Sequence, residues 1–145
     1  DAATMLKAGQ ALVAAGIDLW VTVILGLTGK GGDWEEHILK TADIINQMKP
    51  RHLSAMTLGA AKGTPLGDDV LAGRFVMAEP QQILEECHLL IEKLNVDPLH
   101  FTSNHASNYL PLKGGLPEDR EKFLSAIDQA LEGKIRLRKP LDRGI

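Results

Sequence analysis

This chain has little of the chemistry that marks several common classes of protein. It contains one cysteine, Cys87, in 145 residues, which excludes an internal disulfide framework and a multi-cysteine metal site within these residues. Acidic and basic residues nearly balance at a net charge of −3, so no electrostatic footprint indicates nucleic-acid binding. No apolar run reaches the roughly 18 residues of a membrane span. We therefore expect a protein of a reducing, cytoplasmic setting, without a membrane segment or a nucleic-acid partner.

Motifs of well-known catalytic and phosphate-binding sites are also missing. The glycine-rich segment at 26–32 matches neither the Walker A pattern nor GxGxxG. There is no GxSxG elbow, no HExxH and no carboxylate pair in a loop. His105 has no second His or Cys at ligand spacing, so a metal site is not expected. Cys87 lies on an apolar helical stripe and is interpreted as a small buried hydrophobic residue. No catalytic acid, base or nucleophile is identified.

The residues that are present predict one α/β domain. An apolar fraction of 44% with 24% charged residues is typical of a folded domain. The apolar run at 18–25, bounded by turn residues and followed by a helical pattern, is typical of a strand in a parallel sheet. Repetition of this pattern predicts the order αβαβαβα with right-handed crossovers. We expect helices at 2–15, 33–49, 80–94 and 117–133, strands at 18–25, 51–58 and 99–103, and a domain at 1–133 followed by a solvated basic tail at 134–145.

Three loops follow the three predicted strands, at 26–32, 59–78 and 104–115, and parallel topology brings them to one edge of the sheet. The first is glycine-rich, and such a loop is more often a tight turn than a ligand cradle. The third places four hydrogen-bonding side chains within five residues, which indicates either a self-capped turn or a polar rim facing a ligand. The remaining histidines, on predicted helices or strands, are interpreted as surface or satisfied core groups: His37, His52, His88 and His100.

Three segments, in their order and spacing, resemble the radical SAM superfamily. They are VTVILGLTGKGGDWEEHILKTADIIN at 21–46, TLGAAKGTPLGDDVLAGRF at 57–75 and FTSNHASNYLPLKGGLPEDREKFLSAID at 101–128. The similarity is greatest to the branch of oxygen-independent coproporphyrinogen oxidase-like and Elp3-like proteins. It implies an α/β fold in which parallel βα repeats form half of a partial, TIM-like (β/α)6 barrel, roughly its strands four to six.

The resemblance also implies cofactors. In this superfamily a [4Fe-4S] cluster, held by a CxxxCxxC loop after the first strand, cleaves S-adenosylmethionine, and the resulting 5′-deoxyadenosyl radical abstracts hydrogen from a substrate. A GxIxGxxE-like element lies along the adenine. Ile24 and Gly26 match its inner positions, while Thr22 replaces the first glycine and the glutamate is not in frame. The cofactor-binding residues implied are Ile24, Gly26 and Leu27 on the adenine wall, and Asn104, His105, Ser107 and Asn108 in the last loop.

The cluster motif is not in this chain. By the resemblance, its three cysteines and the first half of the barrel would lie upstream of Asp1, where the chain enters a helical pattern directly. We then expect a protein fragment that is inactive alone, binds S-adenosylmethionine weakly or not at all, and has the missing amino-terminal half as its partner. We also expect it to associate with another copy through its exposed strand edge. The small-molecule substrate is not identified. The alternatives are a stand-alone α/β nucleotide- or phosphate-binding module without radical chemistry, and a scaffold whose loops are merely turns.

Overall fold

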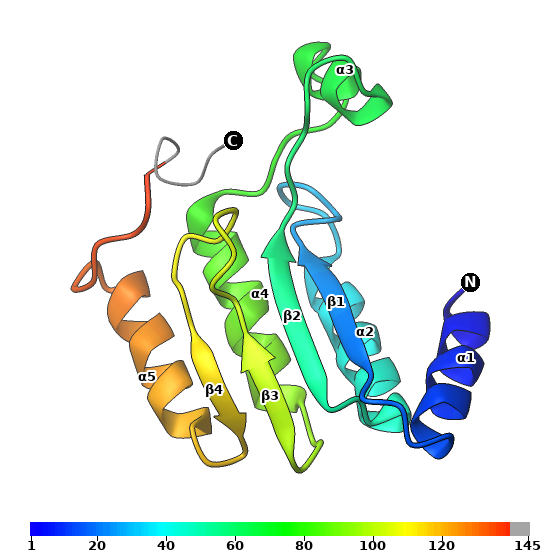
Figure 1. Cartoon of the computed structure of the whole chain (residues 1–145). Helices are drawn as coiled ribbons and strands as arrows, with labels where there is room; N and C mark the ends of the chain where they lie inside the picture. Colours follow the sequence, from blue (N-terminus) through cyan, green and yellow to red (C-terminus); the bar gives the residue numbers. More distant parts are fainter. Residues whose placement is uncertain (140–145) are drawn as a thin grey trace.

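The computed structural model describes residues 1–139, and its centre is a four-stranded sheet. The strands lie in the order β1 (Trp20–Leu25), β2 (His52–Thr57), β3 (Leu99–Thr102) and β4 (Lys113–Leu116) (Figure 1). The first three are parallel, and β4 runs antiparallel to β3. The carboxyl ends of β1, β2 and β3 therefore meet at one edge, as the sequence predicts.

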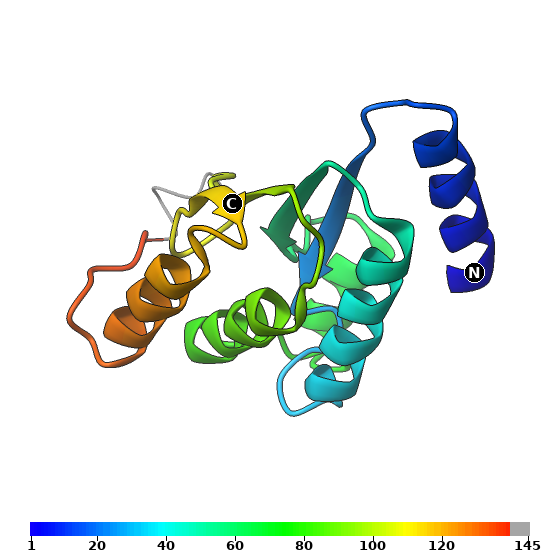
Figure 2. The ribbon, with the colours of Figure 1, turned by 90° about the horizontal axis from the view of Figure 1, so that it is seen from below.

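Helices cover only one face of this sheet (Figure 2). α2 (Trp34–Met48), α4 (Pro80–Lys93) and α5 (Arg120–Leu131) lie side by side against it. α1 (Ala2–Ala14) packs against α2 beyond β1, and the short α3 (Pro65–Leu71) stands above the carboxyl ends of the strands (Figure 1). The opposite face carries no helix from residues 1–139, and we call it the open face. None of the described helices has the length and apolarity needed to span a bilayer.

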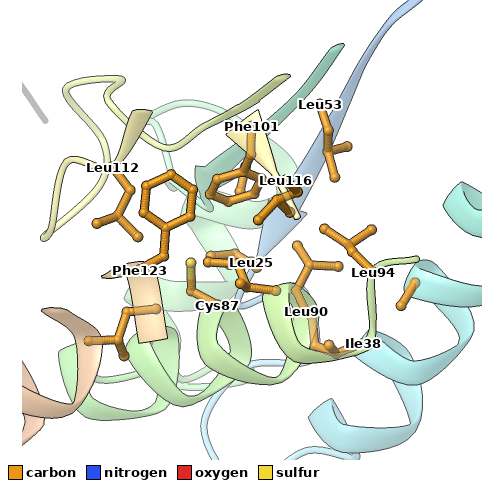
Figure 3. Close-up of a cluster of buried hydrophobic side chains, with 14 of the residues drawn as sticks. Leu25, Ile38, Leu53, Cys87, Leu90, Leu94, Phe101, Leu112, Leu116 and Phe123 are labelled. Atoms are coloured by element: carbon orange, nitrogen blue, oxygen red, sulfur yellow. The ribbon is translucent and has the colours of Figure 1, made fainter. Parts of the chain in front are cut away.

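The hydrophobic core lies between the sheet and the helix layer (Figure 3). Side chains alternate along β2, so Leu53 and Ala55 are buried under the helices while their neighbours point to the open face. Phe101 of β3 meets Phe123 of α5 with ring centroids 5.9 Å apart, and Leu90 of α4 is fully buried beside them. The apolar stripes that predict the helices are thus the surfaces that attach α2, α4 and α5 to the sheet.

The structure confirms the α/β class and the three parallel strands, and it adds two elements that the predicted order lacks. β4 begins within the predicted loop 104–115 and ends one residue beyond it, at Leu116. Two of its four residues are glycines, which are poor strand formers, so only its pairing with β3 makes it a strand. α3 forms within the predicted loop 59–78, with the Thr64 hydroxyl accepting a bond from the amide of Gly67. The last helix begins at Arg120, later than predicted.

The beginning of the predicted solvated tail instead packs on the domain. Ile135 and Leu137 rest against the core. The amide of Arg138 donates to the carbonyl of Tyr109 at 2.9 Å, which ties this segment to the loop after β3. Residues 140–145 of the predicted tail lie outside the described residues.

Candidate functional site

The strand register places the side chains of the open face in rows across the sheet. Residues that are paired in the register point to the same side, so each row takes one side chain from each strand. We call these the ring row (Trp20, His52, His100), the hydroxyl row (Thr22, Ser54, Thr102, ending at Lys113 of β4) and the apolar pair (Ile24, Met56). The ring and hydroxyl rows, with Met56 and the loop residues Asn104 and His105, line a groove of about 470 Å³.

The ring row is a continuous stack across three strands. The rings of Trp20 and His52 lie 5.0 Å apart between centroids, and those of His52 and His100 lie 5.1 Å apart, each pair inclined by 17°. The indole of Trp20 donates to the hydroxyl of Ser54 at 2.7 Å, which fixes its orientation although the residue is 60% exposed. Stacked rings on a sheet face without helices present ring edges and the two end faces of the stack to a ligand.

The titratable residues that line the groove are all of the basic types. Its titratable lining residues are three histidines and Lys113, and no aspartate or glutamate lines it. The whole chain nevertheless contains 19 acidic residues and has a net charge of −3. Lys113 is the lining residue that carries a formal charge at pH 7, and with no carboxylate in the lining it favours an anionic ligand.

The adenine-wall residues implied by the resemblance do not all share one environment. Ile24 lies on the open face with 38% of its surface exposed, opposite Met56 in the register. Leu27, in the following loop, is 45% exposed. Gly26 between them is buried. Ile24 and Met56 therefore offer an apolar surface at the carboxyl end of the strands, whereas Gly26 faces the helix layer.

The glycine-rich loop is bonded to the protein itself. The amide of Gly26 donates to a carboxyl oxygen of Glu86 at 2.6 Å, and the amide of Lys30 donates to the carbonyl of Val76 at 2.8 Å. A Cβ at Gly26, whose φ is +82°, would lie 2.8 Å from the Ile83 side chain. These glycines therefore serve a tight turn packed on α4, which is the plainer of the two interpretations that the sequence leaves open.

The loop after β3 divides into a buried part and an exposed part. Asn108 is 3% exposed, and its amide group donates to the carbonyls of Ala55 (2.9 Å) and Ser103 (2.8 Å) while its oxygen accepts from the Thr57 hydroxyl (2.9 Å). The Ser107 hydroxyl, also buried, accepts from the amide of Thr57 at 3.2 Å. Both side chains therefore hold the loop onto β2, as in a self-capped turn, and only the other two predicted residues form a rim.

His105 is the rim residue whose hydrogen bonds define its chemistry. Its Nδ1 accepts from the amide of Ser107 at 3.1 Å, so this nitrogen carries no proton. The Ser107 hydroxyl, 2.9 Å from Nδ1, then donates to it, and the proton of the neutral ring lies on Nε2. Asn104 beside it is exposed, and its side-chain oxygen accepts from the Thr102 hydroxyl at 2.8 Å. His105 thus offers an N–H donor at one end of the groove.

Cys87 does not line this groove. Cys87 is buried, as predicted, and its burial, with the neighbouring Glu86 carboxyl, raises the pKa of the thiol to about 12. Residues 1–139 contain no group of three or more His, Cys, Asp or Glu side chains placed to hold a metal ion.

The sequence reasoning missed the ring row. His52 and His100 were interpreted as surface or satisfied core groups, and Trp20 and Lys113 received no role. His52 and His100 alternate along their strands with the buried Leu53, Leu99 and Phe101, which predicts a position on the far side of the strand. The nearly unbroken apolar run that contains Trp20 has no such alternation. The alternation could have placed the two histidines on the open face, but not beside one another or beside Trp20, because their alignment depends on the register between strands.

Comparisons with protein-family models, with curated proteins and with solved structures give no match. The geometry therefore defines the class of this protein only as an α/β domain with a four-stranded, mainly parallel sheet and one open face.

Proposed function

We propose that this chain is the carboxyl-terminal half of a radical SAM catalytic barrel and that the open face is the inner wall of that barrel. In βα barrels the helices lie outside, and the other face of the strands points inward. The single helix layer and the three parallel strands are compatible with this arrangement. β4, which is antiparallel, ends the run of parallel strands at one edge, so the missing half would join at β1.

The observation that carries the proposal is the apolar surface at the β1 edge. Six of the ten exposed large hydrophobic residues in residues 1–139 belong to the first 27 residues: Met5, Leu12, Ile17, Trp20, Ile24 and Leu27. In the described part of the chain, β1 pairs with a strand on one side only. An unpaired parallel edge next to exposed apolar side chains favours coverage by another strand and its helix. An upstream βα segment would supply both.

The two cofactors fit the described residues differently. The cluster has no site in them, because the one cysteine is buried and no metal-ligating group is assembled. The nucleoside of S-adenosylmethionine fits the carboxyl end of the strands, where Ile24 and Met56 are apolar and the ring N–H of His105 is available. S-adenosylmethionine would supply the 5′-deoxyadenosyl radical in the complete enzyme. The residues of this chain would orient the nucleoside and exclude water from it.

The alternative of a phosphate-cradling glycine-rich loop gains no support from the hydrogen bonds. A phosphate cradle needs backbone N–H groups that point at the ligand. The amides of Gly26 and Lys30 are bonded to Glu86 and Val76, and the amide of Gly29 donates to the carbonyl of Gly26.

The first test is the coding sequence upstream of Asp1, over about 200 residues, the span of the missing part of a βα barrel. A CxxxCxxC after an apolar strand is the expected result. The longer protein should then take up a [4Fe-4S] cluster and release 5′-deoxyadenosine from S-adenosylmethionine under reducing conditions. A start codon immediately before Asp1, or an upstream region without these cysteines, would overturn the proposal.

A second test addresses the residues of this chain within that longer protein. Ile24→Asp places a charge on the proposed adenine wall and should weaken S-adenosylmethionine binding at least tenfold in calorimetry. Leu71→Asp, on the exposed surface of α3, is the matched control and should leave the affinity unchanged. Equal affinities for the two variants would remove Ile24 from the site.

A further inference from the structure

The ring row stops at a position where the next strand has no side chain. His100 pairs with Gly115 of β4 in the register. The ring of His100 stacks on His52 on one side, and on the other side β4 contributes only backbone. A row of stacked rings therefore ends in a gap over Gly115.

Neither crowding nor backbone conformation requires glycine at this position. A Cβ at Gly115 would meet only the carboxyl oxygen Oε2 of Glu118, at an ordinary 3.5 Å, and its φ is not in the left-handed region. Gly114, on the helix side of the same strand, is different, since a Cβ there would lie 2.2 Å from Asp119 Oδ2. No side chain of β4 therefore covers the position over Gly115, and the carboxyl group of Glu118 borders it.

A basic side chain lies one row away from this gap. Lys113 is two residues before Gly115 on the same strand and the same face, opposite Thr102, and it lines the groove. No ion pair between described residues involves Lys113. At about 3.3 Å rise per residue, its Cα is about 7 Å along the strand from that of Gly115.

We propose that this part of the open face binds a nucleoside monophosphate. The base stacks on the ring of His100 over Gly115, and the phosphate binds the ammonium group of Lys113. The Cα separation of about 7 Å along the strand suits a ring joined to its anion through a sugar. Glu118 at the gap accepts from a ring N–H, which favours a guanine base over an adenine base.

This proposal does not depend on radical chemistry. It concerns β3 and β4, at the other edge of the sheet from β1, where the upstream half barrel would join. The 145-residue chain can therefore be tested for this site directly, and the result bears on the ligand of the open face whether or not a cluster-binding half exists.

The test is isothermal titration calorimetry with GMP, compared with guanosine, ribose 5-phosphate and AMP. GMP should bind with a dissociation constant below about 1 mM, and each of the other three at least tenfold more weakly. Binding should shift the Gly115 amide resonance. Failure of GMP to bind at millimolar concentration, or equal binding of guanosine and GMP, would overturn the proposal.

Variants locate the binding. Gly115→Val fills the gap with a residue that favours strands and should abolish detectable binding while the melting temperature is retained. Lys113→Ala should lower the affinity for GMP at least tenfold, whereas Lys62→Ala, on the exposed loop before α3, should leave this affinity unchanged. If Gly115→Val does not fold, the Lys113 and Lys62 pair still decides the outcome. GMP binding that neither Gly115→Val nor Lys113→Ala weakens would place the site elsewhere.

Discussion

At the scale of single residues, the buried carboxyl group of Glu86 organises the start of the glycine-rich loop. One of its oxygens accepts from the amide of Gly26 at 2.6 Å and the other from the side chain of Gln82 at 2.9 Å. Gln82 also donates to the carbonyl of Gly29. A carboxyl group inside the protein is tolerated because these donors replace water.

Glu86→Ala should therefore destabilise the fold by about 1–3 kcal/mol, because the buried amide of Gly26 loses its acceptor. Glu85→Ala is the matched control on the same helix, a half-buried residue whose carboxylate accepts only from the exposed Gln81, and it should change stability by less than about 0.5 kcal/mol. Urea unfolding followed by circular dichroism measures both. Equal midpoints for the two variants would contradict this role of Glu86.

Cys87 predicts a pH dependence at alkaline pH. Its thiol has a pKa of about 12 in the folded chain against 9.0 for an unperturbed thiol. Between these values the native state keeps a proton that the unfolded state has lost. The contribution of the thiol to the free energy of unfolding is therefore fully present below pH 9, and it falls by about 1.4 kcal/mol per pH unit as the pH rises toward 12.

Unfolding free energies at pH 8.5 and 10.5 test this dependence. Lys and Tyr groups also titrate in this range, so the quantity of interest is the difference between the original chain and Cys87→Ala. The loss of stability with pH should be smaller in the variant. Identical losses would show that the thiol does not contribute.

At the scale of elements, two buried side chains, Ser107 and Asn108, attach the loop after β3 to β2. Asn108 bonds the carbonyl of Ala55 and the hydroxyl of Thr57, both in β2, as well as the carbonyl of Ser103. Arg138 adds a second attachment from the chain beyond α5, since its guanidinium donates to the carbonyl of His105 at 3.0 Å. The rim residues thus stand on a fixed loop.

Asn108→Ala should destabilise the chain by about 2–3 kcal/mol, because two carbonyls and a hydroxyl in a buried place lose their partner together. Asn104→Ala in the exposed part of the same loop should cost less than about 1 kcal/mol. Thermal unfolding compares the two. Hydrogen exchange at 104–112 should accelerate in the Asn108 variant only, and unchanged exchange there would argue against the attachment.

At the scale of the whole molecule, the exposed apolar residues and the unpaired edge of β1 predict self-association of the isolated chain. Sedimentation velocity between 1 and about 100 μM should show a concentration-dependent shift to a dimer. Met5→Lys combined with Ile17→Lys should suppress it, because the two charges interrupt the exposed apolar surface beside β1. Leu71→Lys, which is exposed on α3 away from this edge, serves as the control. A monomer throughout this range would contradict the prediction.

The candidate site illustrates how far sequence reasoning reaches. Reasoning from the sequence correctly brings the loops after β1, β2 and β3 to one edge of the sheet, because the carboxyl ends of parallel strands lie at the same edge. The sequence also groups Asn104, His105, Ser107 and Asn108 in one loop. It cannot tell which of these side chains are buried and which are exposed, since burial depends on how the loop folds back onto β2. The sequence also leaves open whether Gly26 belongs to a tight turn or to a ligand cradle, because its hydrogen-bond partner Glu86 lies in a helix far along the chain.

The sequence by itself determined the α/β class, the positions of β1, α2, β2, α4 and β3, and the burial of Cys87. These features follow from local periodicity and from turn residues, which act within a few positions of the chain. The tertiary structure alone decided that Lys113–Leu116 is a strand, that Trp20, His52 and His100 form one stack, and that a gap lies over Gly115. The physical reason is that strand pairing aligns residues distant in the sequence, and no local pattern encodes that register.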